Sequence, residues 1–358
     1  MSIVEKIKNV INDVKENIDI KKTVSKVINE TTHMVEKNEI IKEIEANDSI
    51  IILRHMRPDG DCIGSTFGLR EVLRKSFPNK KIYSVGDGVP EYLAFLGEED
   101  EVSEETFKES LVIVVDTATS KRVVSEYENL KEKCKKVIKI DHHIPVDSYG
   151  DINYVRDDFP ACCQIIADLV MTSNNKLIMT EHAATCLYTG LVTDTGRFRF
   201  RSVDSKTFKI ASFLLEHNID TEKIYTHLNT KSKESFKLQG YIYQNFKVTE
   251  NGVAYAYITK RLMKKFNASV EDASNLVNCM DSVKGSFIWI LFVQYDNEIR
   301  VRLRSRHLPV VEIGEKFNGG GHANACGATI KTKKELKQLL EMADNKLKDF
   351  KKDNKGLF

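Results

Sequence analysis

Short apolar runs alternate with helix-like segments through the first half of the chain. Four runs have the length and β-branched content of buried strands: Ser49–Leu53, Lys81–Val85, Leu111–Val115 and Val137–Ile140. Between and after them, helical spacing is found over 62–77, 120–134, 161–173 and 181–193. Strands that alternate with helices predict an α/β domain whose mostly parallel sheet is covered on both faces.

The pattern changes toward the C-terminus, where it predicts a second, smaller α/β domain. Residues 205–246 are helical in pattern and polar, and we interpret them as the tail of the first domain and a connector. Strands are predicted at Val253–Ile258, Phe287–Val293 and Ile299–Arg304, then a glycine-rich segment and a helix over 332–348. The predicted boundaries are 46–230 for the first domain, 231–250 for the connector and 251–350 for the second domain.

Residues 1–45 are predicted to form a helical N-terminal extension. Ile3, Ile7, Val10 and Val14 share one helical stripe, and Val24, Val27 and Ile28 begin a second. Packing against the body of the protein explains these stripes most simply, and a helix that binds a partner or a second copy is the alternative. A membrane-surface helix is disfavoured because the polar face carries both signs of charge.

Composition narrows the class of protein. Hydrophobic residues make up 41% and charged residues 30%, as in soluble globular proteins, and the net charge of +2 disfavours a broad nucleic-acid surface but leaves room for a local basic cleft. The seven cysteines form no Cys-x-x-Cys motif, which indicates reduced thiols and a cytoplasmic protein. No apolar run reaches the ~18–20 residues of a membrane span.

A histidine and two aspartates follow the first predicted strand. His55, Asp59 and Asp61 lie in the loop that leads to the next helix. Open α/β sheets bind ligands at the carboxyl ends of their strands, and one imidazole with two carboxylates suits Mn²⁺, Mg²⁺ or Zn²⁺. A polar turn built on Pro58-Asp59-Gly60 is the alternative for this loop taken alone.

Two later strands and one helix end in residues of the same kinds. Asp116 follows Val115, and Asp141, His142 and His143 follow Ile140. Asp194 ends the helix that begins near residue 181, where the negative end of the helix dipole repels it and a bound cation would offset the repulsion. The set supplies two imidazoles and four carboxylates, enough for two divalent ions about 3.5–4 Å apart: His55, Asp59, Asp61, Asp116, His142 and Asp194.

These groups resemble the four motifs of the DHH phosphoesterase superfamily: His55-x-x-Pro58-Asp59-x-Asp61, Asp116, Asp141-His142-His143 and Asp194. The segment Gly319-Gly320-Gly321-His322, followed by Asn324 and Gly327-Ala328, resembles the signature of the DHHA1 domain. Over about residues 40–350, the order and spacing are similar to the bacterial oligoribonuclease (nanoRNase)/pAp-phosphatase branch. One departure is Asn318, where the branch often has another glycine, and we expect the loop still to form.

The resemblance implies a role for each residue. One ion is held by His55 and Asp59, the other by Asp61, His142 and Asp194, and Asp116 bridges the two. Asp141 orients its neighbours, and His143 hydrogen-bonds the scissile phosphate or the leaving group. In the DHHA1 domain, substrate is bound by Arg304, Ser305, Gly319, Gly320, Gly321 and His322, so that short substrates lie in a cleft between the domains.

The implied activity is that of an enzyme with two Mn²⁺ ions, for which Mg²⁺ or Co²⁺ are candidate substitutes. It would hydrolyse short RNA or DNA oligonucleotides from the 3′ end, with removal of the 3′-phosphate of 3′-phosphoadenosine 5′-phosphate (pAp), a mononucleotide bisphosphate, as a further activity. A linear or cyclic dinucleotide phosphodiesterase and a non-catalytic nucleotide-binding regulator are the alternatives. No membrane partner is expected, and a homodimer is left open.

Overall fold

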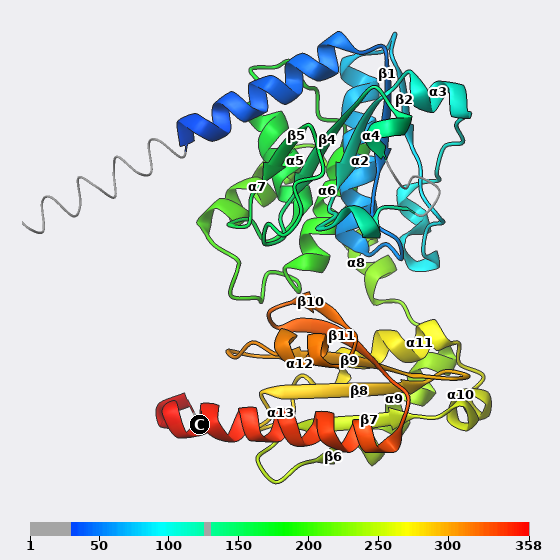
Figure 1. The fold of residues 1–358 in the computed structure, drawn as a ribbon, viewed down its shortest axis with the longest axis vertical. Helices are drawn as coiled ribbons and strands as arrows, with labels where there is room; N and C mark the ends of the chain where they lie inside the picture. The colour runs from blue at the N-terminus through cyan, green and yellow to red at the C-terminus, as the bar shows by residue number, and fades with distance from the viewer. Residues whose placement is uncertain (1–29, 125–129, 358) are drawn as a thin grey trace, which may run out of the picture. The chain divides into compact units, whose positions relative to one another are not determined.

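The computed structural model describes residues 30–124 and 130–357, and the chain divides into two compact units between Asn229 and Thr230 (Figure 1). The predicted stripes over 3–28 lie outside the described residues. A helix over 30–46 begins the described part, and it buries Ile40, Ile41 and Ile44 in the core of the first unit. This described part of the extension therefore packs against the body of the protein, as predicted.

The first unit is built on a parallel sheet. Its strands are β1 (Ser49–Leu53), β2 (Lys81–Ser84), β3 (Leu111–Val115), β4 (Lys136–Asp141) and β5 (Ile152–Val155), in the order β2-β1-β3-β4-β5. Every neighbouring pair is parallel. The four predicted strands are confirmed, whereas β5 was missed. The carboxyl ends of β1, β3 and β4, which are neighbours, lie at one edge of the sheet.

Both faces of this sheet are covered, as the alternation of side chains along the strands requires. Ile50 and Ile52 of β1 face a core shared with the helices, whereas Ile51 and Leu53 face a second core. The helices of the first core are 30–46, α2 (Gly60–Ser76), α5 (Cys162–Met171), α6 (Glu181–Asp194), α7 (Ser205–Leu215) and α8 (Thr221–Asn229). The second core includes residues of α3 (Glu104–Lys108) and α4 (Leu130–Lys133). The short helix η1 (Glu91–Leu96) packs on α2.

The helix predicted over 120–134 is wrong over its described first residues, 120–124, whereas α4 (Leu130–Lys133) lies at its end. A short helix, η2 (Ser120–Arg122), is followed by an isolated β-bridge between Val123 and His55. Met56 N donates to Arg122 O at 2.8 Å, and Val124 N donates to Arg54 O at 3.2 Å. Because these backbone groups bond to the loop after β1, they are not available for helical bonds, and the segment fixes the loop that carries His55.

The second unit contains a mixed sheet in the order β10-β11-β9-β8-β7-β6. Its strands are β6 (Lys247–Val248), β7 (Ala254–Ile258), β8 (Ile288–Gln294), β9 (Ile299–Ser305), β10 (Gly320–His322) and β11 (Ala325–Ile330). The predicted strands at 253–258, 287–293 and 299–304 are confirmed. Of the neighbouring pairs, β7 and β8 are parallel and the other four are antiparallel.

Helices cover both faces of the second sheet. Residues of α12 (Val311–Lys316) and α13 (Lys333–Asp353) line one core with Ile288 and Ile290, and the other core contains Trp289 and Leu291. The second core is lined by α9 (Lys233–Asn245), α10 (Lys260–Phe266), α11 (Val270–Asn275) and η4 (Leu276–Met280), and η5 (Lys355–Leu357) follows α13. The segment 231–250, interpreted as a connector, thus supplies α9 and β6 to this unit. In the described part of the chain, no helix is both long and apolar enough to cross a membrane.

Candidate metal centre

The sequence-predicted donors meet at the carboxyl edge of the first sheet. His55 follows β1, Asp116 follows β3, and Asp141 is the last residue of β4, directly before His142. Three groups of donor atoms each lie within 4.8 Å of one another: His55–Cys62–Asp116, Asp116–His142–His143 and Asp61–His142–Asp194. Asp116 and His142 each belong to two groups, so the three groups form one continuous cluster.

Asp116 occupies the centre of this cluster. One carboxylate oxygen, Oδ2, lies 3.5 Å from His55 Nε2, and the other, Oδ1, lies 3.3 Å from His142 Nε2 and 3.7 Å from His143 Nδ1. The backbone of Asp116 has a φ of 50°, in the left-handed region, where aspartate is enriched among non-glycine residues. Its N–H donates to Ile140 O at 3.0 Å. The sharp turn after β3 thus directs this carboxylate between the histidines of two neighbouring strands.

His142 and Asp61 come from different elements and face the same point. His142 Nε2 lies 3.7 Å from Asp61 Oδ2 and 3.5 Å from Asp194 Oδ2, and its Nδ1 lies 3.3 Å from the carbonyl oxygen of Phe159. If Nδ1 donates to that carbonyl, Nε2 is left to bind a cation. The imidazole is therefore oriented from behind by a backbone group.

The Asp61 carboxylate is fixed by the beginning of α5. Cys162 N donates to Oδ2 at 2.6 Å, and Cys163 N donates to Oδ1 at 2.9 Å. Asp61 is fully buried, so the hydrogen bonds and the positive end of the helix dipole offset part of the cost of its charge. Carboxylate oxygens have further lone pairs that can accept a metal ion.

Asp194 sits where the sequence placed it, on the last turn of α6. The helix ends in a Schellman motif: Gly196 N donates to Thr193 O at 3.2 Å, and Arg197 N donates to Val192 O at 2.8 Å. Gly196, the residue after the C-cap Thr195, has a φ of 56°, the left-handed conformation that this motif requires. The motif holds the carboxylate near the negative end of the helix, close to Asp61 and His142.

His143 lies on the outer side of the cluster and is held by Asp141. Its Nδ1 lies 2.7 Å from Asp141 Oδ1, which also accepts from the backbone N–H of His142 at 2.9 Å and of His143 at 3.3 Å. The other oxygen of Asp141 lies 3.3 Å from Nζ of Lys139, a buried lysine that donates to the carbonyls of Ala118 and Asp147. Asp141 thus orients the His-His pair through Oδ1, while its Oδ2 forms an ion pair with Lys139.

The electrostatics of the cluster show an excess of negative charge. Burial, together with the charge of Asp116, raises the pKa of Asp61 to about 7, and burial with repulsion from Asp61 and Asp59 raises the pKa of Asp194. Burial would lower the pKa of the two histidines, but nearby groups outweigh it. Cys62 and Asp116 raise the pKa of His55 to about 12, and Asp116, Asp61 and Asp194 raise that of His142 to about 10. For Asp116, the histidines outweigh burial and hold its pKa below the usual range.

Divalent cations fit this cluster. Its donors are imidazole nitrogens and carboxylate oxygens, the ligands preferred by Mn²⁺ and its neighbours among the metals. Asp116 Oδ1 is buried and accepts no hydrogen bond, so it has a free lone pair directed among the histidines. The carboxylates that resist ionisation and the histidines that hold protons are both features that a bound cation would reverse.

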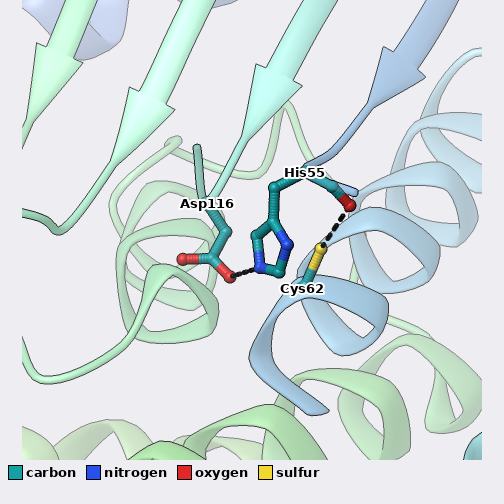
Figure 2. Close-up of side chains that lie close together, drawn as sticks. All are labelled: His55, Cys62 and Asp116. Carbon is teal, nitrogen blue, oxygen red and sulfur yellow. Dashed lines mark hydrogen bonds and ion pairs between the residues drawn. The ribbon is translucent and has the colours of Figure 1, made fainter. Parts of the chain in front are cut away.

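Near His55, the structure places Cys62 where the sequence predicted Asp59 as a donor. Figure 2 shows the imidazole of His55 beside the Asp116 carboxylate, with the Cys62 sulfur on the α2 side. The predicted partner Asp59 is exposed, and its Oδ1 accepts from Cys62 N at 3.1 Å as the N-cap of α2. Among the described residues, Asp59 belongs to none of the three donor groups, so its role as a ligand stays a prediction.

The candidate substrate residues of the second unit lie on β9 and beyond. Arg304 is half-buried and donates to the carbonyls of Leu303 and Cys326; burial and the charge of Arg302 lower its pKa to about 10, so it remains charged at neutral pH. Ser305 is buried, donates to Leu308 O at 2.6 Å and accepts from Asn324 Nδ2 at 3.0 Å. The Ser305 hydroxyl hydrogen is therefore already used within the unit.

The glycine segment forms an edge strand and not an open loop. A Cβ on Gly319 would lie 1.9 Å from Gly327 O, and Gly321 has a φ of 140°, so both positions require glycine. Gly320 is exposed and has free space beside it. Asn318 has a φ of 56°, a conformation that asparagine accepts, and this explains how the segment forms without the fourth glycine. The side chain of His322 lies outside the described part of the structure.

Sequence reasoning missed two features of this region. Cys62 directly follows Asp61, and its place at the third residue of α2 was the available signal. The segment Arg197–Arg201, which follows Asp194, alternates arginine with Phe198 and Phe200, a pattern typical of single-stranded nucleic-acid sites. Phe200 is 47% exposed, and the three arginines are exposed.

Comparison with known proteins identifies the family. Residues 49–191 match the DHH family, N-terminal domain, and residues 250–349 match the DHHA1 domain. The bifunctional oligoribonuclease and PAP phosphatase NrnA of Bacillus subtilis is 37% identical over 305 residues, which cover 85% of this chain and 96% of the relative. The chain belongs to the DHH family.

Another relative and a solved structure support the same family assignment. The bifunctional oligoribonuclease and PAP phosphatase NrnA of Mycoplasma genitalium is 34% identical over 308 residues, covering 84% of this chain and 95% of the relative. A crystal structure of an exopolyphosphatase-related protein from Bacteroides fragilis matches with a TM-score of 0.80 at 27% identity, over 88% of this chain and 98% of that one. The predicted family, two-domain α/β fold and hydrolase class are thereby confirmed, and DHH phosphoesterases are metal-dependent enzymes.

Proposed function

We propose that this protein is a phosphoesterase that uses two divalent ions to hydrolyse short oligonucleotides from the 3′ end, and that it also removes the 3′-phosphate of pAp. The observation that carries the proposal is the position of Asp116, whose two carboxylate oxygens lie near His55 on one side and His142 on the other. A carboxylate shared by two donor groups is the arrangement that two adjacent ions need.

The assignment of ligands follows the three donor groups. His55 and Asp116 would hold one ion, with Asp59 as a further ligand if its side chain leaves the N-cap of α2. Asp61, His142 and Asp194 would hold the other ion, together with Asp116. When bound, such ions supply the Lewis acidity that activates water and offsets the charge of the phosphate. Mn²⁺ is the proposed ion because it accepts mixed imidazole and carboxylate ligands.

The residues around the ions would orient and protonate the substrate. His143 is less buried than His142, its Nδ1 is held by Asp141, and it is the proposed donor to the scissile phosphate or to the leaving oxygen. Asp141 would keep this imidazole in one orientation. In the second unit, Arg304 would bind a phosphate of the substrate, because it keeps its charge and is only half-buried.

Two observations support nucleotides as the substrate class. The relatives of Bacillus subtilis and Mycoplasma genitalium are named oligoribonuclease and PAP phosphatase, and they align over nearly their whole length. In this chain, the exposed ring of Phe200 is six residues from Asp194 and stands among arginines. Aromatic rings beside basic side chains stack bases and bind the phosphate backbone without regard to sequence, so we propose that Phe200 stacks on a base of the substrate.

The replacement of Asp116 by alanine tests the proposal. Asp116→Ala should abolish Mn²⁺-dependent hydrolysis of RNA 2- to 7-mers and of pAp and should reduce the number of bound Mn²⁺ ions, while circular dichroism remains that of the wild type. Asp157→Ala, which removes an exposed carboxylate of the same unit, is the control and should keep both properties. Retained Mn²⁺-dependent turnover in Asp116→Ala would contradict the two-ion proposal.

A nucleotide-binding regulator without activity is the second candidate. It would bind dinucleotides but show no turnover with Mn²⁺, Mg²⁺ or Co²⁺. The same substrate panel, extended to linear and cyclic dinucleotides, therefore separates an oligonucleotide hydrolase, a dinucleotide phosphodiesterase and a regulator in one experiment.

A further inference from the structure

We propose that Cys62 is a metal ligand, and that it gives the His55 half of the centre a second binding mode for thiophilic divalent ions such as Zn²⁺ and Cd²⁺. The inference rests on the proposed two-ion centre, whose His55 and Asp116 it shares. His55, Cys62 and Asp116 are all buried, and one donor atom from each lies within 4.8 Å of the other two (Figure 2).

The position of the sulfur is fixed by the loop and the helix together. Cys62 is the third residue of α2, and its N–H is bound by Asp59, the N-cap. The sulfur lies 4.0 Å from the carbonyl oxygen of His55, so it faces the loop that carries the imidazole (Figure 2). That loop is itself held by the β-bridge between His55 and Val123. The three donors are thus brought together by backbone structure.

The donor set of nitrogen, sulfur and oxygen discriminates among metals. Zn²⁺ and Cd²⁺ bind thiolates well, whereas Mn²⁺ and Mg²⁺ prefer oxygen. Binding through Cys62 breaks the S–H bond and forms a bond from sulfur to the metal, and binding through His55 replaces its N–H proton in the same way, so that both protons are released to the solvent. Burial raises the pKa of the free Cys62 thiol to about 11, and the positive end of the long helix α2, in whose first turn it lies, offsets part of that cost once the ion is bound.

This binding mode competes with the hydrolytic one. An ion held by Cys62 uses His55 and Asp116, both of which the proposed Mn²⁺ centre needs. Zn²⁺ or Cd²⁺ should therefore displace Mn²⁺ from this half and inhibit hydrolysis.

The test is a titration of the full-length apoprotein with Cd²⁺ and Co²⁺, followed by ultraviolet absorption, where a bond from sulfur to the metal gives a charge-transfer band. The band should appear in the wild type, with one more proton released for each ion bound than in Cys62→Ala, and should be absent in Cys62→Ala. Cys134→Ala is the matched control, because Cys134 precedes β4 at the opposite end of that strand from Asp141. It should keep the band. Cys62→Ala should also weaken Cd²⁺ binding at least about tenfold more than Mn²⁺ binding.

The outcomes separate this inference from the proposed function. No band in the wild type, or a band that persists in Cys62→Ala, overturns the role of Cys62, whatever the hydrolytic activity. A Cys62-dependent band in a protein that shows no turnover supports the inference while the proposed function fails. Cys62→Ser keeps the size of the side chain and should also lack the band, so a packing defect in the alanine variant cannot decide the result.

Discussion

The Asp141 carboxylate accepts a hydrogen bond from the His143 imidazole, with 2.7 Å between Oδ1 and Nδ1. Burial alone would raise the pKa of Asp141, but His143 and Lys139 outweigh it and hold the pKa below its ordinary value. Asp141 therefore stays ionised at neutral pH, and in the proposed reaction it would support a positive charge on His143.

Replacing Asp141 by asparagine keeps the size of the side chain and removes its charge. We expect kcat to fall roughly 10–100-fold, because the imidazole loses its orienting partner, with a smaller change in KM. The measurement is steady-state hydrolysis of a dinucleotide. If Asp141 acts through His143, the double variant Asp141→Asn/His143→Asn should be no slower than His143→Asn alone, and additive losses would contradict that role.

Arg304→Ala should raise KM about tenfold or more and change kcat little, since it removes a charge-assisted contact to phosphate and no metal ligand. Arg300→Ala is the control on the same face of β9: Arg300 pairs with Glu298 and lies over the Tyr295 ring, 4.2 Å from its centroid. It should leave KM unchanged. Equal KM values for a dinucleotide in wild type and Arg304→Ala would remove Arg304 from the substrate site.

Phe200→Ala should weaken the binding of RNA 2-mers by about 1–3 kcal/mol, the usual value for the loss of one stacked base. The expected readout is a higher Kd for a non-hydrolysable dinucleotide analogue, measured by calorimetry. Phe236 of α9 is similarly exposed, at 59%, and Phe236→Ala should bind as the wild type does. A Phe200→Ala variant that binds equally well would show that this ring serves only to cover Gly196, against which it packs.

The pKa shifts of the cluster predict how the stability of the metal-free protein depends on pH. The pKa of Asp61 is raised to about 7, and the pKa of Asp194 is also raised. The folded protein therefore holds these two protons more tightly than the unfolded chain does, and this stabilisation is lost as pH increases. The pKa of His55 is raised to about 12 and that of His142 to about 10, so the folded protein holds both imidazole protons more tightly than the unfolded chain does. This stabilisation is fully present below about pH 6.5 and is lost as the pH rises toward the two raised pKa values. Both contributions have the same sign: the apoprotein should become less stable from about pH 5 to about pH 9.

Urea unfolding in EDTA measures this slope. With saturating Mn²⁺ the slope should be smaller or reversed, because the ion replaces the protons and binds more tightly as they leave. In Asp61→Asn, the slope in EDTA should also be smaller. A metal-free wild type that gains stability between about pH 5 and about pH 9 would contradict the charge excess inferred for the cluster.

Much of the centre could be predicted from the sequence because parallel strands end at one edge. Strongly apolar strands such as β3 are visible in the pattern, and the residues after them are then neighbours. The spacing could not show that Asp59 is used as the N-cap of α2, or that Cys62 lies within reach of His55, because both depend on side-chain direction. The left-handed turn at Asp116 is likewise set by tertiary structure.

The error in the helix prediction has the same origin. The helix expected over 120–134 fails at Val123, whose backbone pairs with the His55 loop, a contact far away in the sequence. Close packing of β10 on β11 gives Gly319 and Gly321 a structural reason, and the substrate role that the resemblance implies for them stays a prediction. Local pattern therefore predicted which elements form, and long-range hydrogen bonds decided the segments between them.

The carboxylate of Asp194, at the negative end of α6, lowers the stability of the metal-free fold but is a ligand in the proposed metal centre. Its exchange for asparagine would remove repulsion from the helix end and from Asp61 without changing the side chain's size. Such a protein should melt at a higher temperature without metal while losing activity. A laboratory selection for heat resistance alone would therefore replace this aspartate early, whereas a selection that requires turnover would keep it and gather its stabilising substitutions elsewhere in the chain.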